Sequence, residues 1–484
     1  MSAFTIAFQF PNLIRALFAD AALQGAFVPV FTELLEQGKR KEAFRVASSL
    51  FFLICLVLGA LTALFMLLAP VVMPLLTPGF DEETQDLTVG LSRVMFPIVL
   101  LLALSGLVVG MLNSFGHFSV PALAPLAWNL VIIAALVGLV PVFPEEDEIY
   151  AYAIGVLLGT IVQLVMPMPW LRGRGGRFTL SFDFRDPRVI RVLKLMLPVT
   201  IALGLINFSL LINSFFGTLV QEEAPAAIDK AFRIYMLPQG LFSVAIATIL
   251  FPTLARYAAR GDRDLLRATM GNGVRQIAML LIPSAVIMAV LAEPITRLVY
   301  ERGEFDAAAT ELVSEAMLWW SVSLPFQGIS LLYSRTYFSL QKPWTTTALA
   351  GLNLVVNAIV AAALYEPLGV AGIVIGTVVA TVGMTVAQGW MLRPELGGVE
   401  ERETLVAGGY MLVAGAFLGI VTWATWTVLD DVLGRALFAQ ATAVGVAITI
   451  GLTAYALLVR AMELEEARQI QRLVTDRLRR SGTA

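Results

Sequence analysis

Residues 26–38 read AFVPVFTELLEQG, and residues 249–261 read ILFPTLARYAARG. In both stretches a proline stands nine residues before a glycine, and charged residues follow. The offset of 223 positions is nearly kept by later matches: Leu68-Ala69 with Leu291-Ala292, Gly79-Phe80-Asp81 with Glu304-Phe305-Asp306, and Pro121 before Asn129 with Pro343 before Asn353. Several ordered matches at nearly one spacing indicate an internal duplication.

The composition is that of a membrane protein. Hydrophobic residues make up 58% of the 484 residues, charged residues make up 14%, and the mean hydropathy is +0.81. A helix needs about 20 apolar residues to cross a bilayer. We therefore predict an all-α, polytopic fold with about thirteen transmembrane helices, near residues 3–33, 46–77, 88–112, 120–142, 150–170, 189–218, 227–255, 273–298, 312–339, 345–365, 369–391, 405–428 and 437–459.

The loops on one side of these spans carry 25 lysines and arginines, whereas the loops on the other side carry four. Lys and Arg gather in cytoplasmic loops, so residues 36–45 and the C-terminus are predicted to be cytoplasmic. Met1 then lies outside, although no signal peptide precedes the first span. We expect that one N-terminal helix is missing from this sequence; a re-entrant pair within residues 3–33 is the alternative.

The duplication also predicts the domain organisation. Six spans separate the matched elements, so the two six-helix lobes share one orientation, as in parallel-repeat transporters with a site between the halves. The predicted parts are an N-terminal lobe at 1–170, a basic cytoplasmic connector at 171–188, a C-terminal lobe at 189–391, two additional helices at 405–460 and an amphipathic cytoplasmic tail at 461–484.

Residues for catalysis or metal binding are scarce. Cys55 is the single cysteine and His117 the single histidine, and the loop acids are scattered. An intramembrane enzyme would need paired acids or a histidine at the end of a span. We therefore expect no enzyme activity, no catalytic residues, no metal site and no cofactor, although coupling to the membrane potential or to a monovalent ion is left open.

Two arginines lie deep in hydrophobic segments, Arg15 near Pro11 and Arg233 near Pro238. An arginine at that depth costs at least about 2.5 kcal/mol, so it normally faces a water-filled cavity or a partner. The two occupy equivalent helices of the two halves, which predicts a cleft with two guanidinium groups for an anionic substrate. The alternative is that Arg15 pairs with Asp20, and Arg233 with Asp229.

Several sequence blocks resemble those of the MurJ/MviN family of bacterial lipid II flippases. These blocks are Pro11-Asn12-Leu13-Ile14-Arg15, Thr77-Pro78-Gly79-Phe80, Leu237-Pro238-Gln239-Gly240, Glu301-Arg302-Gly303-Glu304-Phe305 and Arg335-Thr336-Tyr337-Phe338-Ser339-Leu340. The resemblance covers essentially the whole chain. It implies a fourteen-helix exporter fold in the bacterial inner membrane that moves lipid II, an undecaprenyl-pyrophosphate-linked peptidoglycan precursor, to the outer leaflet.

The resemblance also implies roles for single residues. Arg15 and Arg233 correspond to cavity arginines that meet the pyrophosphate, and Asp20 stands where the family usually has glutamate. Ser2 and Phe232 replace common aspartates, and Asp229 is a candidate substitute carboxylate. Asn12 and Gln239, from the quoted blocks, complete the candidate substrate-binding set.

The implied partners are lipid II, membrane lipids and cell-wall synthesis or division proteins, and no nucleic acid is expected. The two additional helices resemble a pair that forms a groove for the lipid tail. A cation-coupled multidrug exporter or another polysaccharide-lipid exporter of the same superfamily is the alternative function.

Overall fold

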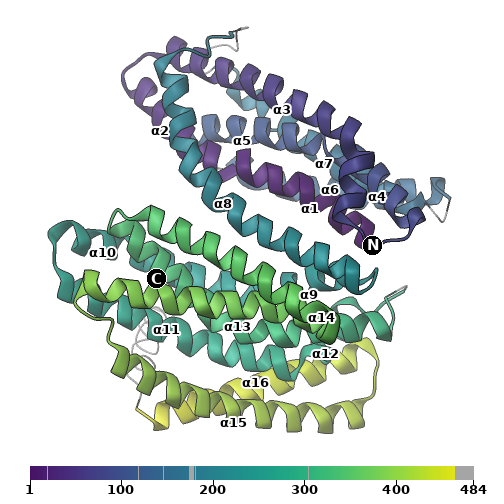
Figure 1. The fold of residues 1–484 in the computed structure, drawn as a ribbon, viewed down its shortest axis with the longest axis vertical. Coiled ribbons are helices and arrows are strands. Elements are labelled where there is room, and N and C mark those ends of the chain that lie inside the picture. The colour runs from purple at the N-terminus through teal and green to yellow at the C-terminus, as the bar shows by residue number, and fades with distance from the viewer. Residues whose placement is uncertain are drawn as a thin grey trace, which may run out of the picture. The chain divides into compact units, whose positions relative to one another are not determined.

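The computed structural model describes residues 1–18, 20–117, 119–144, 147–173, 179, 181–303 and 305–463. For some helical residues, including Arg15 and Asp20, it describes only the backbone. The described residues form helices and no strands. They divide into two compact units, Met1–Pro225 and Ala226–Ala484 (Figure 1).

The first unit contains eight α-helices: α1 (Ser2–Phe18), α2 (Asp20–Glu36), α3 (Arg40–Leu76), α4 (Glu82–Met95), α5 (Ile98–Ser114), α6 (Ser119–Leu139), α7 (Glu148–Val165) and α8 (Pro187–Val220). The last of these packs against α1 and α2, and Ser214 donates a hydrogen bond to Gln9 at 2.5 Å. The unit therefore ends after α8, whereas the repeat predicts that the C-terminal lobe begins at residue 189. The lobe boundaries stay a prediction.

The second unit begins within α9 (Ala224–Pro238), which continues through a π-helical turn, η4 (Gln239–Val244), into α10 (Ala245–Arg260). The remaining helices are α11 (Arg263–Val290), α12 (Ala292–Tyr300), α13 (Ala307–Ser339), α14 (Pro343–Leu396), α15 (Glu401–Leu433) and α16 (Leu437–Ala461). The predicted amphipathic tail lies largely outside the described residues, which stop at 463.

The duplicated motif builds the same helix end twice. Gly38 and Gly261 have φ of 71° and 69°, the left-handed conformation that glycine adopts at little cost. Gly38 N–H donates to the Leu35 carbonyl and the next N–H to Leu34, and Gly261 and its successor repeat this pattern with Ala258 and Tyr257. The backbone requirement explains why both copies keep the glycine.

A second matched element also has one structure in both copies. Asp81 caps the N-terminus of α4 by accepting a hydrogen bond from the Thr84 N–H at 2.9 Å. Asp306 caps α13 in the same way, with the Ala309 N–H at 2.9 Å. The Phe-Asp pairs of the sequence repeat therefore mark equivalent helix starts.

The first predicted span, residues 3–33, forms α1 and α2, which pack along α4 and α5. Ala3 and Phe4 of α1 pack with Leu91 and Met95 of α4. Phe27 and Phe31 of α2, together with their neighbours, pack in the cluster that contains Leu107, Met111 and Leu112 of α5. This progression favours one broken helix that crosses the unit over a re-entrant pair.

Within the described residues, nine helices are long and apolar enough to cross a membrane. One of them is α14, which covers two predicted spans because the chain turns at Gly369 (φ 56°). Gly372 and Gly376 then lie against Leu364 and Ala361, so α14 is a hairpin of two helices. The predicted spans at 3–33, 189–218 and 312–339 are also helical, in α1 with α2, α8 and α13.

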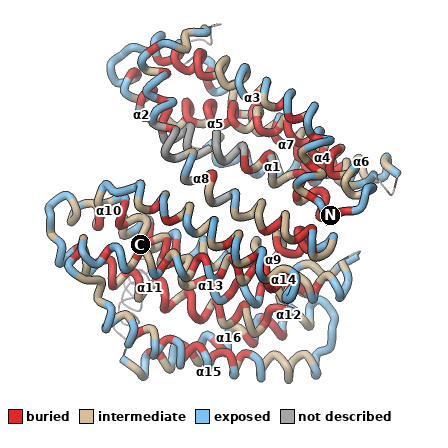
Figure 2. The backbone as a smooth tube through the Cα atoms, in the orientation of Figure 1, coloured by how far each residue is buried: buried red, intermediate tan, exposed pale blue. Residues whose placement is uncertain are grey.

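The outer faces of these helices suit lipid. On α3, Phe65, Ala69 and Met73 are buried, whereas Leu67 and Leu75 are at least 70% exposed. Figure 2 shows this division along α3 as buried and exposed stretches of one helix. Large apolar side chains on an outer face are stable in a bilayer, where hydrocarbon replaces water.

Candidate functional site

One face of α9 is an aromatic anchor. Tyr235 is fully buried, its ring lies 5.0 Å from the ring of Trp320 on α13, and its hydroxyl accepts a hydrogen bond from Ser323 at 3.1 Å. Phe232 packs edge-on against the same Trp320, with ring centres 4.6 Å apart. These contacts fix the rotation of α9 about its own axis, and so decide which residues it presents on its other face.

Arg233 lies on that other face, and its side chain is 63% exposed. Its Nε donates a hydrogen bond to Asp229 one turn earlier, at 2.8 Å. The neighbouring Lys230 ammonium lies 5.2 Å from the centre of the Phe305 ring, and Tyr300 donates to the Lys230 carbonyl. The predicted ion pair between Arg233 and Asp229 is therefore formed, on a side chain that is largely exposed.

The span changes its helical geometry where Gln239 lies. Pro238 lacks an N–H and clashes with the preceding turn of a regular helix. The chain responds with the wider π-helical turn η4, which begins at Gln239. Turns of this kind occur often at functional sites. Gln239 is half-buried in this turn, six residues after Arg233.

The first-half candidates are less fully described. Asn12 is half-buried in α1, next to the buried Pro11. The side chains of Arg15 and Asp20 lie outside the described residues, so the predicted pair of facing arginines and the alternative Arg15–Asp20 ion pair stay predictions. The structure brings together Asp229 and Arg233 from the candidate set.

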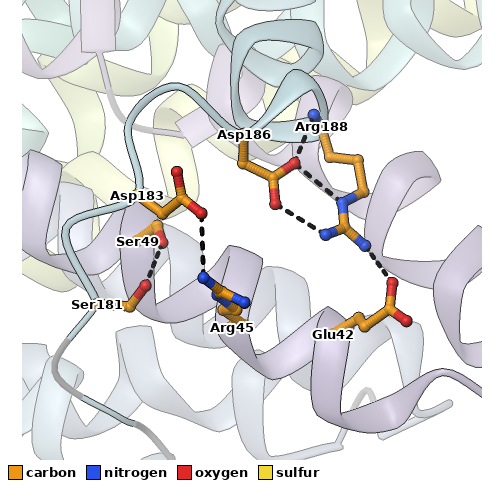
Figure 3. A network of polar contacts seen from close by, with 7 residues as sticks. All are labelled: Glu42, Arg45, Ser49, Ser181, Asp183, Asp186 and Arg188. Atoms are coloured by element: carbon orange, nitrogen blue, oxygen red, sulfur yellow. Dashed lines mark hydrogen bonds and ion pairs between the residues drawn. The ribbon is translucent and has the colours of Figure 1, made fainter.

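A second polar network joins the connector to α3 within the first unit, and we call it the connector clasp. It consists of Glu42, Arg45, Ser49, Ser181, Asp183, Asp186 and Arg188 (Figure 3). Arg45 pairs with Asp183 at 3.1 Å, and the hydroxyls of Ser49 and Ser181 are 2.8 Å apart. Arg188 bridges Asp186 and Glu42, at 2.8 and 2.5 Å. The sequence predicts a basic connector but gives no signal for its acidic partners, which come from α3 and from the connector itself.

Asp186 is the centre of the connector clasp. Its buried carboxylate accepts hydrogen bonds from the Arg188 N–H and guanidinium, and it caps the N-terminus of α8. The hydrogen bonds from the Arg188 side chain hold the pKa of Asp186 below its usual range. The same carboxylate raises the pKa of Arg188. Both groups are therefore charged at neutral pH.

A further ion pair links α11 to the segment just before the two additional helices, within the second unit. Arg275 of α11, 12% exposed, pairs with Glu400 at 3.0 Å in the short link between α14 and α15. A Cβ atom on Gly271 would lie 2.3 Å from the Glu400 carboxylate, so only glycine fits there without a shift. Arg275 lies near the start of the predicted span 273–298, and the sequence gives no signal that Glu400 is its partner.

No group of three metal-ligating side chains occurs among the described residues. The candidate site is instead built around Arg233, a cation on an exposed face of α9. It lies within the long broken span Ala224–Arg260 of a helical bundle whose sequence is internally repeated. A bundle of this kind, with its halves related by an internal repeat, is the architecture of a membrane transporter.

Comparisons with known proteins agree with this class and define the family. The sequence profile of the family described as "Lipid II flippase MurJ" matches residues 1–464. A probable lipid II flippase MurJ from Rhizobium meliloti is 32% identical over 78% of this chain and 71% of its own length. One from Bdellovibrio bacteriovorus is 29% identical over 97% of this chain and 90% of its own. The chain belongs to the lipid II flippase MurJ family.

Solved structures support the fold. A lipid II flippase MurJ in an inward closed conformation has a TM-score of 0.77 at 22% identity, over 96% of this chain and 93% of that one. An inward-facing multidrug resistance MATE family transporter of the MOP superfamily has a TM-score of 0.70 at 15% identity, over 83% and 94%. The predictions of an all-α, multi-pass membrane protein of the bacterial inner membrane, and of a transporter rather than an enzyme, are confirmed.

Proposed function

We propose that this chain moves lipid II from the inner to the outer leaflet of the cytoplasmic membrane. The match to the family profile along residues 1–464 carries the proposal. The relatives from Rhizobium meliloti and Bdellovibrio bacteriovorus are named for the same cargo. Lipid II joins a charged pyrophosphate to a long apolar tail, so its carrier needs cations inside an apolar bundle.

Arg233 and Arg15 are the proposed pyrophosphate ligands. Arg233 supports this role because its guanidinium is exposed on α9 although it lies within a hydrophobic span. A planar guanidinium binds two phosphate oxygens at once, which an ammonium group does not. Asp229 orients this guanidinium through its Nε, and Asn12, Asp20 and Gln239 are proposed to bind the remaining headgroup.

The test measures retention of lipid II by native mass spectrometry. Arg15→Ala and Arg233→Ala are each expected to weaken binding by about tenfold or more, since a charge-assisted pair is lost, and Arg→Lys should rescue only part of it. Lys230→Met is the matched control, because Lys230 is a neighbouring cation on α9 that packs on Phe305. Unchanged binding in both alanine variants would leave the Asp229–Arg233 pair with a structural role only.

Transport is proposed to proceed by alternating access of the two halves. The segments 78–87 and 299–306, which include the start of α4 and the end of α12, are equivalent in the repeat, and each contains the aspartate cap of the following helix. Cysteines placed in these segments should change their separation when lipid II is added. A cross-link that locks them should stop flipping, and full transport by the locked protein would rule out rocking at this face.

The energy source is proposed to be the membrane potential or a monovalent ion, without a resident cofactor. The competing candidate is a cation-coupled exporter, which the MATE-like fold supports. Binding of a cationic drug but not of lipid II by the purified protein would favour that candidate.

A further inference from the structure

Arg335 differs from every comparable arginine in the described part of the chain. Five arginines there are neither buried nor fully exposed. Four of them have a carboxylate partner: Arg188 with Asp186, Arg267 with Asp264, Arg275 with Glu400, and Arg297 with Glu293. Arg335 has no ion pair within the described residues, and its Nε is buried without a hydrogen-bond partner.

The side chain of Arg335 is nevertheless held in place. Its guanidinium carbon lies 5.4 Å from the centre of the Phe251 ring on α10. Stacking on an aromatic ring fixes the plane of a guanidinium and leaves its N–H edge available. A buried N–H donor without a partner is costly. Arg335 as a residue is only part-buried, and an anionic ligand beside its braced side chain would offset that cost.

The position of Arg335 indicates the chemistry of that ligand. It lies on the last turns of α13, about 6 Å from the helix end at Ser339 along the axis. This is the end predicted to be cytoplasmic, where α10 carries the exposed Arg256 and Arg260, for which no ion pair is found in the described part. A cation at headgroup depth in a basic surrounding suits the phosphate of a membrane lipid.

This location is separate from the Arg233 site. Phe251, which braces Arg335, follows Arg233 by 18 residues of the same span. At 1.5 Å per residue this places the two about 25 Å apart along the span. One phosphate therefore cannot contact both arginines at the same time.

We propose that Arg335, braced by Phe251, binds a lipid phosphate at the basic end of the second unit. Two sources share this chemistry: a resident anionic phospholipid, and the pyrophosphate of an incoming lipid-linked substrate. The second source rests on the proposed function, and the first does not.

The experiment uses the full chain in neutral phosphatidylcholine nanodiscs. Retention of phosphatidylglycerol and of undecaprenyl pyrophosphate is titrated separately by native mass spectrometry, for Arg335→Ala, Arg335→Lys and Phe251→Leu. Arg335→Ala should lower retention of at least one of the two lipids by about tenfold, and Phe251→Leu by less, because the charge remains when the brace is lost. Arg267→Ala is the matched control, since Arg267 lies on the same side and already pairs with Asp264.

The two lipids separate the sources. If Arg335→Ala retains less phosphatidylglycerol but the same amount of undecaprenyl pyrophosphate, Arg335 forms a phospholipid site. If it retains less undecaprenyl pyrophosphate, Arg335 forms a loading site for substrate. Equal retention of both lipids by wild type and Arg335→Ala would overturn the proposal. If Arg233→Ala still loses undecaprenyl pyrophosphate in that case, the proposed function stands. If Arg335→Ala does not fold, the comparison of Arg335→Lys and Phe251→Leu with Arg267→Ala decides in the same way.

Discussion

The two repeat-related turns, residues 26–45 and 249–268, have the same backbone but differ in sign at several charged positions. Both end a helix with a left-handed glycine and the same pair of hydrogen bonds. At the offset of 223 their charges are reversed three times: Glu33 against Arg256, Lys39 against Asp262, and Lys41 against Asp264. The glycine in each turn allows little change because its φ is positive, whereas the exposed charged side chains around it can differ between the copies.

The reversed charges give the two turns different partners. In the first turn Glu33 and Glu42 accept Arg191 and Arg188 from the start of α8. In the second turn Asp262 caps its own helix by accepting from the Leu265 N–H. The same backbone therefore serves two roles. Residues 26–45 bind the end of the connector and the start of α8, whereas in residues 249–268 Asp262 bonds to its own helix start.

The largest effect is expected at Asp186, the centre of the connector clasp. Asp186→Ala removes a helix cap and the buried partner of Arg188, so the start of α8 should lose about 2–3 kcal/mol of local stability. Hydrogen exchange of amides 188–194 measures this loss. Asp183→Ala, which breaks only the exposed pair with Arg45, is the control and should cost well under 1 kcal/mol. Equal effects in the two variants would contradict a clasp centred on Asp186.

The same carboxylate predicts a pH dependence. The pKa of Asp186 is lowered in the folded protein, chiefly by hydrogen bonds from Arg188. Its stabilising contribution is therefore complete above the ordinary carboxyl pKa of about 4 and is lost as the pH falls through the lowered value. Exchange at the start of α8 should be insensitive to pH between 5 and 7, after correction for intrinsic rates, and should rise below about 4. Asp186→Ala should lack this acid step.

The glycine substitutions test the shared backbone. Gly38→Ala and Gly261→Ala should each cost about 1–2 kcal/mol, because an alanine in the left-handed conformation is strained. The two costs should be similar, since a Cβ meets nothing within 4 Å at either site. Gly59→Ala, inside α3 with the same open space, is the control and should stabilise instead. A large difference between the two turns would mean that their backbones are not equivalent.

The two turns differ in the N-cap of the helix that follows, and a side-chain cap is worth about 1 kcal/mol of helix stability. Asp262→Ala should destabilise the start of α11 by that amount, because the Leu265 N–H loses its acceptor. Lys39 caps α3 without a side-chain hydrogen bond, so Lys39→Asp should stabilise α3 by a similar or smaller amount. Exchange rates of the first-turn amides report both changes, and a destabilised Lys39→Asp variant would show that the first turn needs its positive charge.

The smallest effect concerns Glu33. Its pair with Arg191 is exposed on both sides, at 49% and 58%, so Glu33→Gln should cost only a few tenths of a kcal/mol. Glu33→Arg copies the charge of Arg256 and should loosen the start of α8 somewhat more, through repulsion of Arg191. High salt should remove the difference between these two variants.

Sequence periodicity and repeats predict most of this fold, because helix length, caps and turns are local properties. The glycine of each turn and the Phe-Asp pairs were visible in the sequence, and the structure gives each a backbone role. The pairing of Arg233 with Asp229 was also predictable, because residues four apart share a helix face. The turn at Gly369 falls at the first residue of the predicted span 369–391.

Contacts between distant segments were not predictable in the same way. Phe232 stood out only as a replacement for aspartate, and the structure makes it an anchor against Trp320, 88 residues away from it in the chain. Arg275 and Glu400 are 125 residues apart, and nothing local in either sequence marks the other as its partner. Arg335 stood out in the sequence only as the first residue of the block Arg335–Leu340, because an unpaired Nε depends on tertiary packing.

The residue at position 271 affects the ion pair between Arg275 and Glu400. The Glu400 carboxylate occupies the place of a Cβ there, so a larger residue at position 271 of α11 requires the Glu400 side chain to shift beside the half-buried Arg275. Removing one partner of such a pair costs far more than the pair itself gains. Gly271, Arg275 and Glu400 should thus be inherited as a set. A chimaera that exchanges α15 and α16 between two flippases should therefore keep the Arg275–Glu400 pair best when both parents agree at all three positions.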